Sequence, residues 1–187
     1  MLREETEIYL NKFAKYVVQQ SRANLSSQGK NGNLYNSIAS KVEVGANSFR
    51  LQFLMEDYGK FQDKGVKGKD PTKVSSRARI KGQQAPNSPY KFGSGKFKGT
   101  WRLFVNSIDK WVRAKGIRLR DDKGRYTKGN VKTISQIIAS NIYARGIKPS
   151  LFFTKPFEAA FRKLPDELIE AYGLDVEEFL QYTINKK

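Results

Sequence analysis

The sequence contains neither cysteine nor histidine, and these two absences exclude several kinds of site. Without cysteine the chain can form no disulfide and no thiolate metal site. Without histidine it lacks the commonest general base and the commonest zinc ligand, and it can form neither a Ser-His-Asp nor a Cys-His catalytic arrangement. Its aspartates lie in no recognisable metal-binding motif, which argues against a metal-dependent nuclease. We therefore expect a protein that is not an enzyme and that has no metal site and no cofactor.

Long apolar runs are absent as well. No run approaches the length needed to cross a bilayer, and the acidic start Met1–Glu7 lacks the apolar core of a secretory signal. We therefore expect no membrane partner. Of the 187 residues, 39% are hydrophobic and 12% are aromatic, which is enough for one domain with a substantial core. The expectation is a single domain over residues 1–187.

The positive charge of the chain is concentrated in its middle. The formal net charge is +17, and residues 60–132 hold 21 Lys and Arg against 5 Asp and Glu. The remaining residues carry 14 basic and 13 acidic groups, so an almost neutral body accompanies a strongly basic segment. Such a field attracts polyanions such as nucleic acids. The alternative is a solvated, lysine-rich loop whose charge only keeps the protein soluble.

The pattern of apolar residues predicts an α+β fold. Residues 3–27 carry apolar side chains three and four positions apart, which predicts a long helix. Residues 38–55 contain two runs of alternating apolar and polar residues around the turn Gly45–Ser48, which predicts a β-hairpin with one buried face. Helical stripes return at 100–115 and 131–144. We expect this hairpin, or small antiparallel sheet, to pack against the long helices.

The two later helices are each expected to bury one face. In the first, six residues are expected to belong to the core rather than to a ligand platform: Trp101, Phe104, Val105, Ile108, Trp111 and Val112. In the second, the expected core residues are Ile134, Ile137, Ile138 and Ile142. Between them, residues 116–130 fit either a hairpin or a basic loop. A further helix is expected to start at Pro165, with proline in its first turn.

Residues 66–99 are rich in Gly, Pro, Ser and Lys and contain few aliphatic side chains. This composition predicts a long, basic and flexible insertion. Its glycines have the spacing of neither a dinucleotide-binding loop nor a Walker loop. In Tyr90–Phe97 aromatic and basic residues alternate, a combination with which proteins grip single-stranded nucleic acid, although no RNA-recognition or helix-turn-helix pattern accompanies it.

The stretch Arg145–Phe161 combines bulky apolar residues with two prolines, Pro149 and Pro156. The bulky residues are Leu151, Phe152, Phe153 and Phe157. Because proline prevents a helix or a strand from running smoothly, we expect a stiff connector here. Such a connector loses less entropy when it binds. Its rings can anchor either the subunit's own sheet or a neighbouring subunit.

Three segments, taken in order, resemble one known family: Gly32–Ile38 (GNLYNSI), Tyr58–Gly65 (YGKFQDKG) and Lys148–Phe161 (KPSLFFTKPFEAAF). The order resembles that of the head–tail joining, or tail-completion, neck proteins of tailed bacteriophages. That family tends to show a long first helix, a Gly-x-Leu-x-x-Ser-Ile turn, a hairpin, a Tyr-x-x-(Phe/Tyr)-x-x-x-Gly segment and a Pro-Phe-rich entry to the last helix. The resemblance covers roughly residues 1–65 and 143–187 and leaves the basic middle outside.

The resemblance implies a structural virion protein, assembled in the host cytoplasm, whose identical α+β subunits form a ring in the head–tail connector. It implies three further partners: a portal or adaptor protein, tail proteins, and genome DNA that passes nonspecifically through the lumen. It implies no covalent chemistry. The alternative is a free nucleic-acid-binding protein that uses residues 60–132.

These interpretations name two sets of site residues. The expected assembly interface consists of Leu151, Phe152, Phe153, Pro156 and Phe157. The residues expected near DNA are Lys67, Lys69, Lys73, Arg77, Arg79 and Lys81, followed by Arg118, Arg120 and Arg125.

Overall fold

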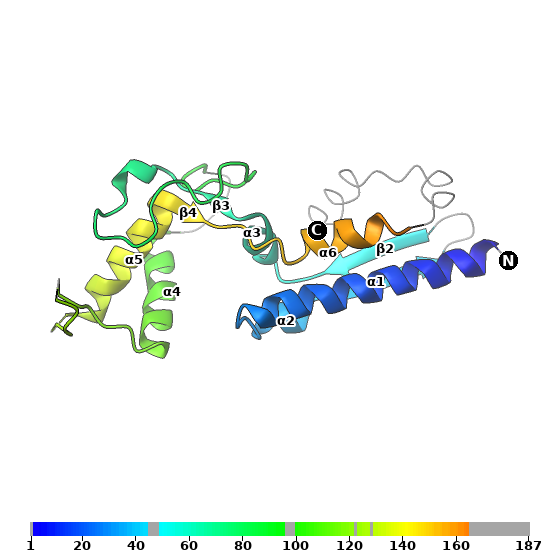
Figure 1. The fold of residues 1–187 in the computed structure, drawn as a ribbon, viewed down its shortest axis with the longest axis horizontal. Coiled ribbons are helices and arrows are strands. Elements are labelled where there is room, and N and C mark those ends of the chain that lie inside the picture. The colour runs from blue at the N-terminus through cyan, green and yellow to red at the C-terminus, as the bar shows by residue number, and fades with distance from the viewer. Residues whose placement is uncertain (1, 45–48, 96–99, 122, 128, 165–187) are drawn as a thin grey trace. The chain divides into compact units, whose positions relative to one another are not determined.

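The computed structural model describes residues 2–44, 49–95, 100–121, 123–127 and 129–164. The chain divides into two compact units: unit 1 consists of residues 1–63 and 150–187, and unit 2 consists of residues 64–149. Helices and a small antiparallel sheet make up the fold, which confirms the predicted α+β class (Figure 1). The inserted unit is longer than the loop predicted at 66–99, because it also contains two helices, α4 (Trp101–Ala114) and α5 (Val131–Arg145).

Unit 1 begins with helix α1, Leu2–Ser27, which confirms the helix predicted at 3–27. Its buried side chains recur every three or four residues between Leu10 and Leu25, so they share one face. The helix ends in a Schellman motif, in which the Lys30 N–H donates to the Leu25 carbonyl at 3.0 Å. The turn uses Gly29 at a φ of 68°, a left-handed conformation that glycine adopts without steric cost.

The predicted hairpin follows a single helical turn, α2 (Asn33–Ser37). Strands β1 (Ala39–Val44) and β2 (Phe49–Leu54) pair antiparallel from Ala39 opposite Leu54 to Val44 opposite Phe49. Along β2, Leu51 and Phe53 are buried while the residues between and beside them are more exposed, as the alternating pattern predicted. The hairpin lies beside α1 (Figure 1). It therefore buries one face against α1, and both elements belong to unit 1.

The chain re-enters unit 1 next to helix α3, Gly59–Lys64, and continues into helix α6, Thr154–Phe161. The sequence predicted a stiff connector that proline keeps from forming a helix. Instead Pro156 is the third residue of α6. The N–H groups of the first helical turn have no partner within the helix, so a proline there removes no hydrogen bond.

The phenylalanines of this stretch belong to the core of unit 1. Phe152, Phe153 and Phe157 have no exposed surface. The Phe157 ring meets the Phe13 ring of α1 edge to face at 5.4 Å, and the Phe153 ring meets the Phe53 ring of β2 at 5.2 Å. Edge-to-face pairs of this kind add to the stability gained by burial alone.

The predicted assembly interface consists of Leu151, Phe152, Phe153, Pro156 and Phe157, and these contacts correct it for every residue except Leu151. Leu151 is half-buried, and the other four are buried within their own subunit. Of the two roles considered for the rings, packing on the subunit's own sheet is the one that the structure shows. The physical reason is that α1 and β2 already enclose the rings, which leaves them no surface for a neighbour.

Asp63 joins the two parts of unit 1. Its buried carboxylate accepts hydrogen bonds from the N–H groups of Phe153 at 2.9 Å and Thr154 at 3.1 Å, and from the Thr154 hydroxyl. A carboxylate at the N-terminus of a helix satisfies free N–H groups and complements the helix dipole. Beside it, the Ser150 N–H donates to the Gln62 carbonyl at 3.1 Å. We call this set of contacts the Asp63 clamp.

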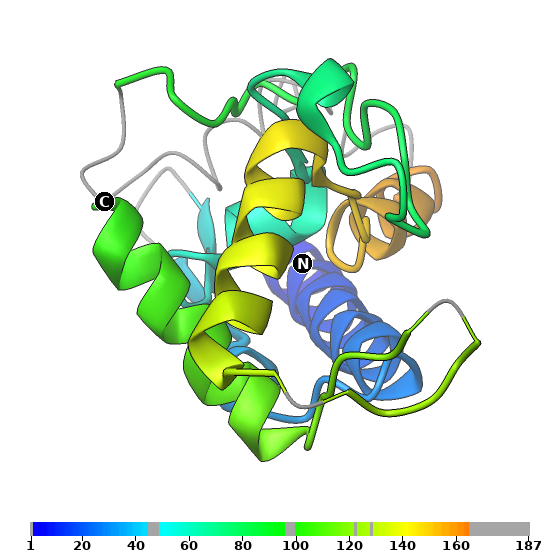
Figure 2. The same ribbon diagram turned by 90° about the vertical axis from the view of Figure 1, so that its left-hand side faces the viewer.

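Unit 2 opens with strand β3 (Val66–Lys67), which pairs antiparallel with β4 (Gly146–Ile147). A short 3-10 helix, η1 (Pro71–Lys73), follows and is capped by the Asp70 carboxylate. Helices α4 and α5 lie side by side (Figure 2). Each starts at a side-chain cap: Thr100 accepts from the Leu103 N–H, and Asn130 from the Lys132 N–H.

The burial predicted for these helices holds only in part. Val112 and Ile134 are buried, and most of the other predicted residues are half-buried. Trp101 and Trp111, however, are 45% and 47% exposed, and Ile137 is 44% exposed. Two packed helices bury only the strip along which they meet, so the wider predicted stripes extend beyond the contact.

The segment from 66 to 95 contains β3 and η1 and is otherwise irregular, and hydrogen bonds attach it to α5. The Ser75 N–H donates to the Asn141 side chain at 2.9 Å, and the Gln84 N–H donates to the Arg145 carbonyl at 2.9 Å. Further on, Arg120 and Tyr126 form an antiparallel bridge, which favours the hairpin over the basic loop for 116–130. The helix predicted from Pro165 lies outside the described residues.

The Asp63 clamp predicts a large effect on stability. Asp63→Ala is expected to lower the free energy of unfolding by about 3 kcal/mol, because it removes a charged acceptor and leaves two buried N–H groups without a partner. Asp63→Asn retains one acceptor oxygen and is expected to lose less. Urea denaturation of the three proteins measures the difference. A loss of less than about 0.5 kcal/mol in the alanine variant, the usual range for surface changes, would contradict this role.

Unit 1 is expected to fold without unit 2. Because the Leu151 N–H lies 3.0 Å from the Asp63 carbonyl oxygen, a Gly-Ser-Gly linker can replace residues 64–149. The hydrophobic core around α1, the hairpin and α6 contains only residues of unit 1, so the excised chain keeps it whole. We expect a helical circular dichroism spectrum and a cooperative thermal transition. A chain without a cooperative transition would show that unit 1 needs the insertion.

The contact between α4 and α5 is expected to weaken in acid. Asp109 accepts from the Arg113 guanidinium at 2.7 Å and from the Ser135 hydroxyl of α5 at 3.1 Å, and the Arg113 bond lowers its pKa. A carboxyl group whose pKa is lowered by folding stabilises the folded state at pH values above its unfolded pKa of about 3.9. This stability is lost as the pH falls through the folded-state pKa.

The measurement is the melting temperature between about pH 6 and pH 2.5. Asp109→Asn should lose less stability than the natural chain over this range. The matched control is Asp121→Asn, in which the carboxyl also has a lowered pKa but bonds only within its own turn. Identical pH profiles for Asp109→Asn and the natural chain would contradict the prediction.

Candidate nucleic-acid interface

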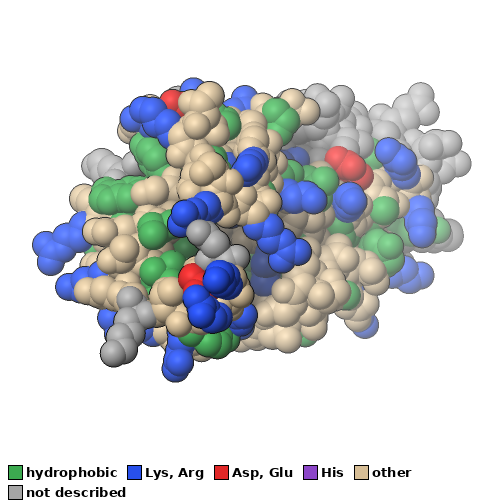
Figure 3. All heavy atoms as spheres, turned by 60° about the vertical axis from the view of Figure 1, so that its left-hand side comes forward, with side chains coloured by type: hydrophobic (Ala, Val, Ile, Leu, Met, Phe, Trp, Pro, Cys, Tyr) green, Lys and Arg blue, Asp and Glu red, His purple; other side chains and the backbone are tan. Residues whose placement is uncertain are grey.

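The charge of the chain follows the division into units. Unit 2 contains 22 Lys and Arg against 4 Asp, whereas the rest of the chain contains 13 basic and 14 acidic residues. On the face drawn in Figure 3, Lys and Arg side chains are widely spread and Asp and Glu side chains are few. The basic segment recognised in the sequence is therefore a compact folded unit with its own helices, and it carries the entire surplus of positive charge.

The carboxylates that the structure describes in unit 2 are each engaged in local contacts. Asp70 caps η1, Asp109 binds Arg113, and Asp121 binds Arg125. A hydrogen bond from the Thr72 hydroxyl lowers the pKa of Asp70, and one from the Arg125 backbone N–H lowers the pKa of Asp121. All three remain ionised at neutral pH, yet they neutralise only a small part of the charge. Unit 2 therefore keeps a strong positive field.

The first six residues predicted near DNA lie on one continuous part of unit 2. Lys67 is in β3, Lys69 follows it, and Lys73 is in η1. The other three follow along the irregular chain: Arg77, Arg79 and Lys81. All except the half-buried Lys67 are exposed. Lys73 lies 3.8 Å from the Asp70 carboxylate, so its charge is partly compensated.

The second predicted group surrounds one tyrosine. The Arg120 guanidinium lies 4.4 Å from the centre of the Tyr126 ring and also donates to its hydroxyl at 2.8 Å, while the Arg118 guanidinium lies at 5.9 Å. Arg125 binds Asp121 through a 2.9 Å ion pair. Arg118 and Arg120 thus place two guanidinium groups beside the Tyr126 ring, whereas the Asp121 carboxylate largely neutralises the charge of Arg125.

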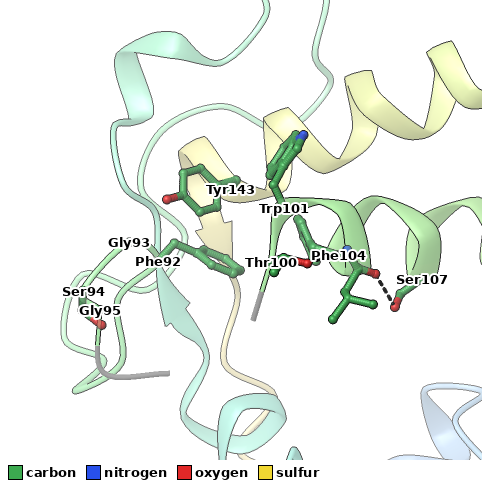
Figure 4. Close-up of a pocket in the computed structure, with 10 residues that line it drawn as sticks. Phe92, Gly93, Ser94, Gly95, Thr100, Trp101, Phe104, Ser107 and Tyr143 are labelled. Atoms are coloured by element: carbon green, nitrogen blue, oxygen red, sulfur yellow. Dashed lines mark hydrogen bonds between the residues drawn. The ribbon is translucent and has the colours of Figure 1, made fainter. Parts of the chain in front are cut away.

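Aromatic rings line a pocket in the same unit (Figure 4). Its volume is 680 Å³, and four rings contribute to its wall: Phe92, Trp101, Phe104 and Tyr143. Adjacent ring centres are 5.3 to 5.9 Å apart, as in favourable aromatic pairs. The remaining lining residues described are glycine, serine, threonine and leucine, so none of the described lining residues carries a carboxylate.

Backbone contacts bring these rings together. The Phe92 N–H donates to the Lys67 carbonyl of β3 at 2.9 Å, and β3 pairs with β4, which directly follows α5 and its Tyr143. The Lys69 N–H donates to the Tyr143 carbonyl at 2.9 Å, and its ammonium nitrogen lies 5.8 Å from the centre of the Tyr143 ring. One predicted DNA-proximal residue thus lies beside the pocket.

The sequence did not indicate the pocket. The aromatic and basic alternation at Tyr90–Phe97 pointed to this part of the chain, but Trp101 was assigned to the core and Tyr143 was not singled out. Tyr143 is 51 residues from Phe92 in the chain. The pairing of β3 with β4 and the backbone hydrogen bonds beside it make the two rings neighbours, 5.3 Å apart.

Two other kinds of site are absent from the described part of the chain. It contains no group of three or more Asp and Glu side chains placed to hold a metal ion. None of its helices combines the length and the apolar character that a membrane span requires. The basic surface and the aromatic pocket of unit 2 are therefore the features from which a binding function can be argued.

Comparison of the chain with models of protein families, with curated proteins and with solved structures found no match. The fold, the distribution of charge and the three segments that resemble neck proteins are the observations that bear on function. Those segments lie almost wholly in unit 1, while the basic surface and the pocket belong to unit 2.

Proposed function

We propose that this protein is a structural subunit of the head–tail connector of a tailed bacteriophage. Identical subunits form a ring between the portal or adaptor protein and the tail, and genome DNA passes through the lumen of the ring. Unit 1 provides the scaffold of the ring, and unit 2 provides positive charge toward the DNA. The protein performs no covalent chemistry in this role and resides in the virion after assembly in the host cytoplasm.

The three segments that suggest this family are parts of one structural module. Gly32–Ile38 forms α2 and the entry to β1, Tyr58–Gly65 contains α3, and Lys148–Phe161 contains α6. The Asp63 clamp connects the second segment with the third. The resemblance therefore concerns residues that depend on one another for folding, which gives their order more weight than three unrelated matches would have.

The separation of charge between the units is the observation that carries the proposal. In a ring, two complementary surfaces of neighbouring identical subunits meet, and a large net charge of one sign on both surfaces would make the subunits repel one another. Unit 1 has almost balanced charge, 13 basic against 14 acidic residues. Unit 2, with 22 basic and 4 acidic residues, has the charge that a polyanion attracts. The chain thus keeps the surface suited to self-association apart from the surface suited to DNA.

The expected DNA contacts are contacts to phosphates. Passage of a genome through a channel requires binding that is independent of sequence and weak enough to permit sliding, and phosphate contacts meet both conditions. Lys69, Arg79 and Lys81 are exposed, and they are expected to contribute more than Lys73, which lies beside Asp70. The alternative function is a free nucleic-acid-binding protein that uses residues 60–132, and the same surplus of charge favours it.

Ring formation and DNA binding can be tested on the same samples. Mass photometry and negative-stain electron microscopy of the full chain, over a range of concentrations, are expected to show closed rings. A six-fold variant with Gln at Lys67, Lys69, Lys73, Arg77, Arg79 and Lys81 should still form rings. Its DNA affinity should depend less on salt, with the slope of log K against log salt reduced by about 5 if all six contact phosphates.

Each other outcome has a definite meaning. A protein that stays monomeric at all concentrations and binds DNA would support the free binder and contradict the connector. A six-fold variant that fails to form rings but keeps the natural salt dependence would show that these charges serve protein contacts. The chain without residues 64–149 is the matched control, since it is expected to lose DNA binding while its scaffold remains.

A further inference from the structure

The aromatic pocket of unit 2 has features that duplex DNA in a channel does not require. Its rings come from three separate segments: Phe92 from the chain after β3, Trp101 and Phe104 from α4, and Tyr143 from α5 (Figure 4). A volume of 680 Å³ is in the usual range of about 300–1,000 Å³ for pockets that hold small molecules or cofactors. Phosphate contacts alone would give no reason for such a lining.

Trp101 is the most exposed of the four rings that line this pocket. It is 45% exposed although its ring contacts Phe104 at 5.9 Å and Tyr143 at 5.7 Å between centres. It is the first residue of α4, directly after the Thr100 cap, where packing against α5 does not enclose it. A large ring that is held at one side and open at the other can stack on a planar ligand without refolding of the helix.

The rim opposite the tryptophan is made of small residues. A side chain at Gly93 would place its Cβ 2.8 Å from the Tyr143 hydroxyl oxygen and 3.2 Å from the Lys69 Cδ, and Gly93 has a φ of 73°. Glycine is therefore favoured at this position for two reasons: the positive φ, and the lack of space for a Cβ atom beside Tyr143. Ser94 and Gly95 lie beside Gly93 in this rim. Because these residues are small, the face of Tyr143 and the Lys69 ammonium group lie close to the opening.

The charge around the pocket is suited to an anion. Lys69 lies 5.8 Å from the centre of the Tyr143 ring, and Lys91 and Arg102 are the exposed neighbours in sequence of Phe92 and Trp101. The described lining contains no carboxylate. A ligand that combines planar aromatic groups with negative charge satisfies both the rings and the cations. Nucleotides have this combination, whereas an apolar or cationic ligand would satisfy only the rings.

We infer that this pocket binds an unpaired base of a single-stranded nucleic acid by stacking, with the adjacent phosphates bound by Lys69 and its basic neighbours. Proteins that bind single strands combine aromatic stacking platforms with a positively charged surface in this way. In a duplex the faces of the bases are covered by their neighbours, so a duplex can use the phosphate contacts but cannot fill the pocket. The inference goes beyond the proposed function, because it holds whether or not the subunits form a ring.

The two tryptophans of the chain provide a matched pair of variants. Trp101 and Trp111 lie on the same helix and are 45% and 47% exposed, but only Trp101 lines the pocket. Trp101→Ala is expected to weaken the binding of a thymidine oligonucleotide about tenfold, because one stacked base is lost. Trp111→Ala should change the affinity less than about twofold. Fluorescence anisotropy of a labelled oligonucleotide measures both, and circular dichroism verifies that both variants are folded.

A duplex of the same length and free thymidine monophosphate are the control ligands. Trp101→Ala should leave duplex affinity unchanged, whereas Lys69→Gln should lower the salt slope by about 1 for single strand and duplex alike. In a Trp111→Phe background, Trp101 is the only tryptophan, and its fluorescence should be quenched by the single strand and not by the duplex. Free nucleotide should bind far more weakly than the strand, since it lacks the neighbouring phosphates.

Several results would overturn the inference. Equal losses in Trp101→Ala and Trp111→Ala would mean that the tryptophans affect binding only through the fold of unit 2. No loss in either would mean that single strands bind through phosphates alone. Quenching of Trp101 by duplex as strong as by single strand would exclude the requirement for an unpaired base. Thymidine monophosphate that binds as tightly as the strand would identify a mononucleotide pocket instead.

Discussion

The Asp63 clamp is the interaction on which the rest of this structure depends. The chain leaves unit 1 at Asp63 and returns at Ser150, and one buried carboxylate binds the start of α6 across that gap. Because α6 carries Phe157 and Phe161 into the core, the aromatic cluster with Phe13 can form only if the returning chain is held in this position. The same contacts bring the two ends of the insertion together, so an 86-residue unit can be accommodated without opening the core.

The consequence of this arrangement is a division of physical properties between two units. Unit 1 contains the large hydrophobic cluster and nearly balanced charge. Unit 2 contains a smaller buried interior and the surplus of Lys and Arg. A high density of like charge destabilises a compact structure through repulsion. Because the like charge is confined to the insertion, its repulsion does not destabilise the core of unit 1. The binding properties of the insertion can also change without altering the scaffold.

The buried phenylalanines of unit 1 and the exposed tryptophan of the unit 2 pocket have opposite roles. In unit 1, Phe153 and Phe157 are fully enclosed by rings and aliphatic side chains, so they stabilise the fold and are unavailable to a partner. In unit 2, Trp101 is held by two rings but remains nearly half exposed. Tryptophan and tyrosine are enriched at binding surfaces because they offer a large rigid face at little entropic cost. Residue type alone could not separate these roles, since both kinds of ring occur in segments with the same apolar character.

The sequence by itself determined the elements whose signals are local. The 3.6-residue periodicity of α1, the alternation in β2 and the cluster of Lys and Arg in residues 60–132 required no knowledge of distant contacts. Only the tertiary structure decided the features that join distant residues. These are the helix that includes Pro156, the enclosure of Phe153 by β2, and the approach of Tyr143 to Phe92. The first two depend on the hydrogen bond between Asp63 and Thr154, and the third depends on the pairing of Val66 with Ile147. Each of these contacts spans more than 75 positions of the chain, and local propensity carries no information about such pairs.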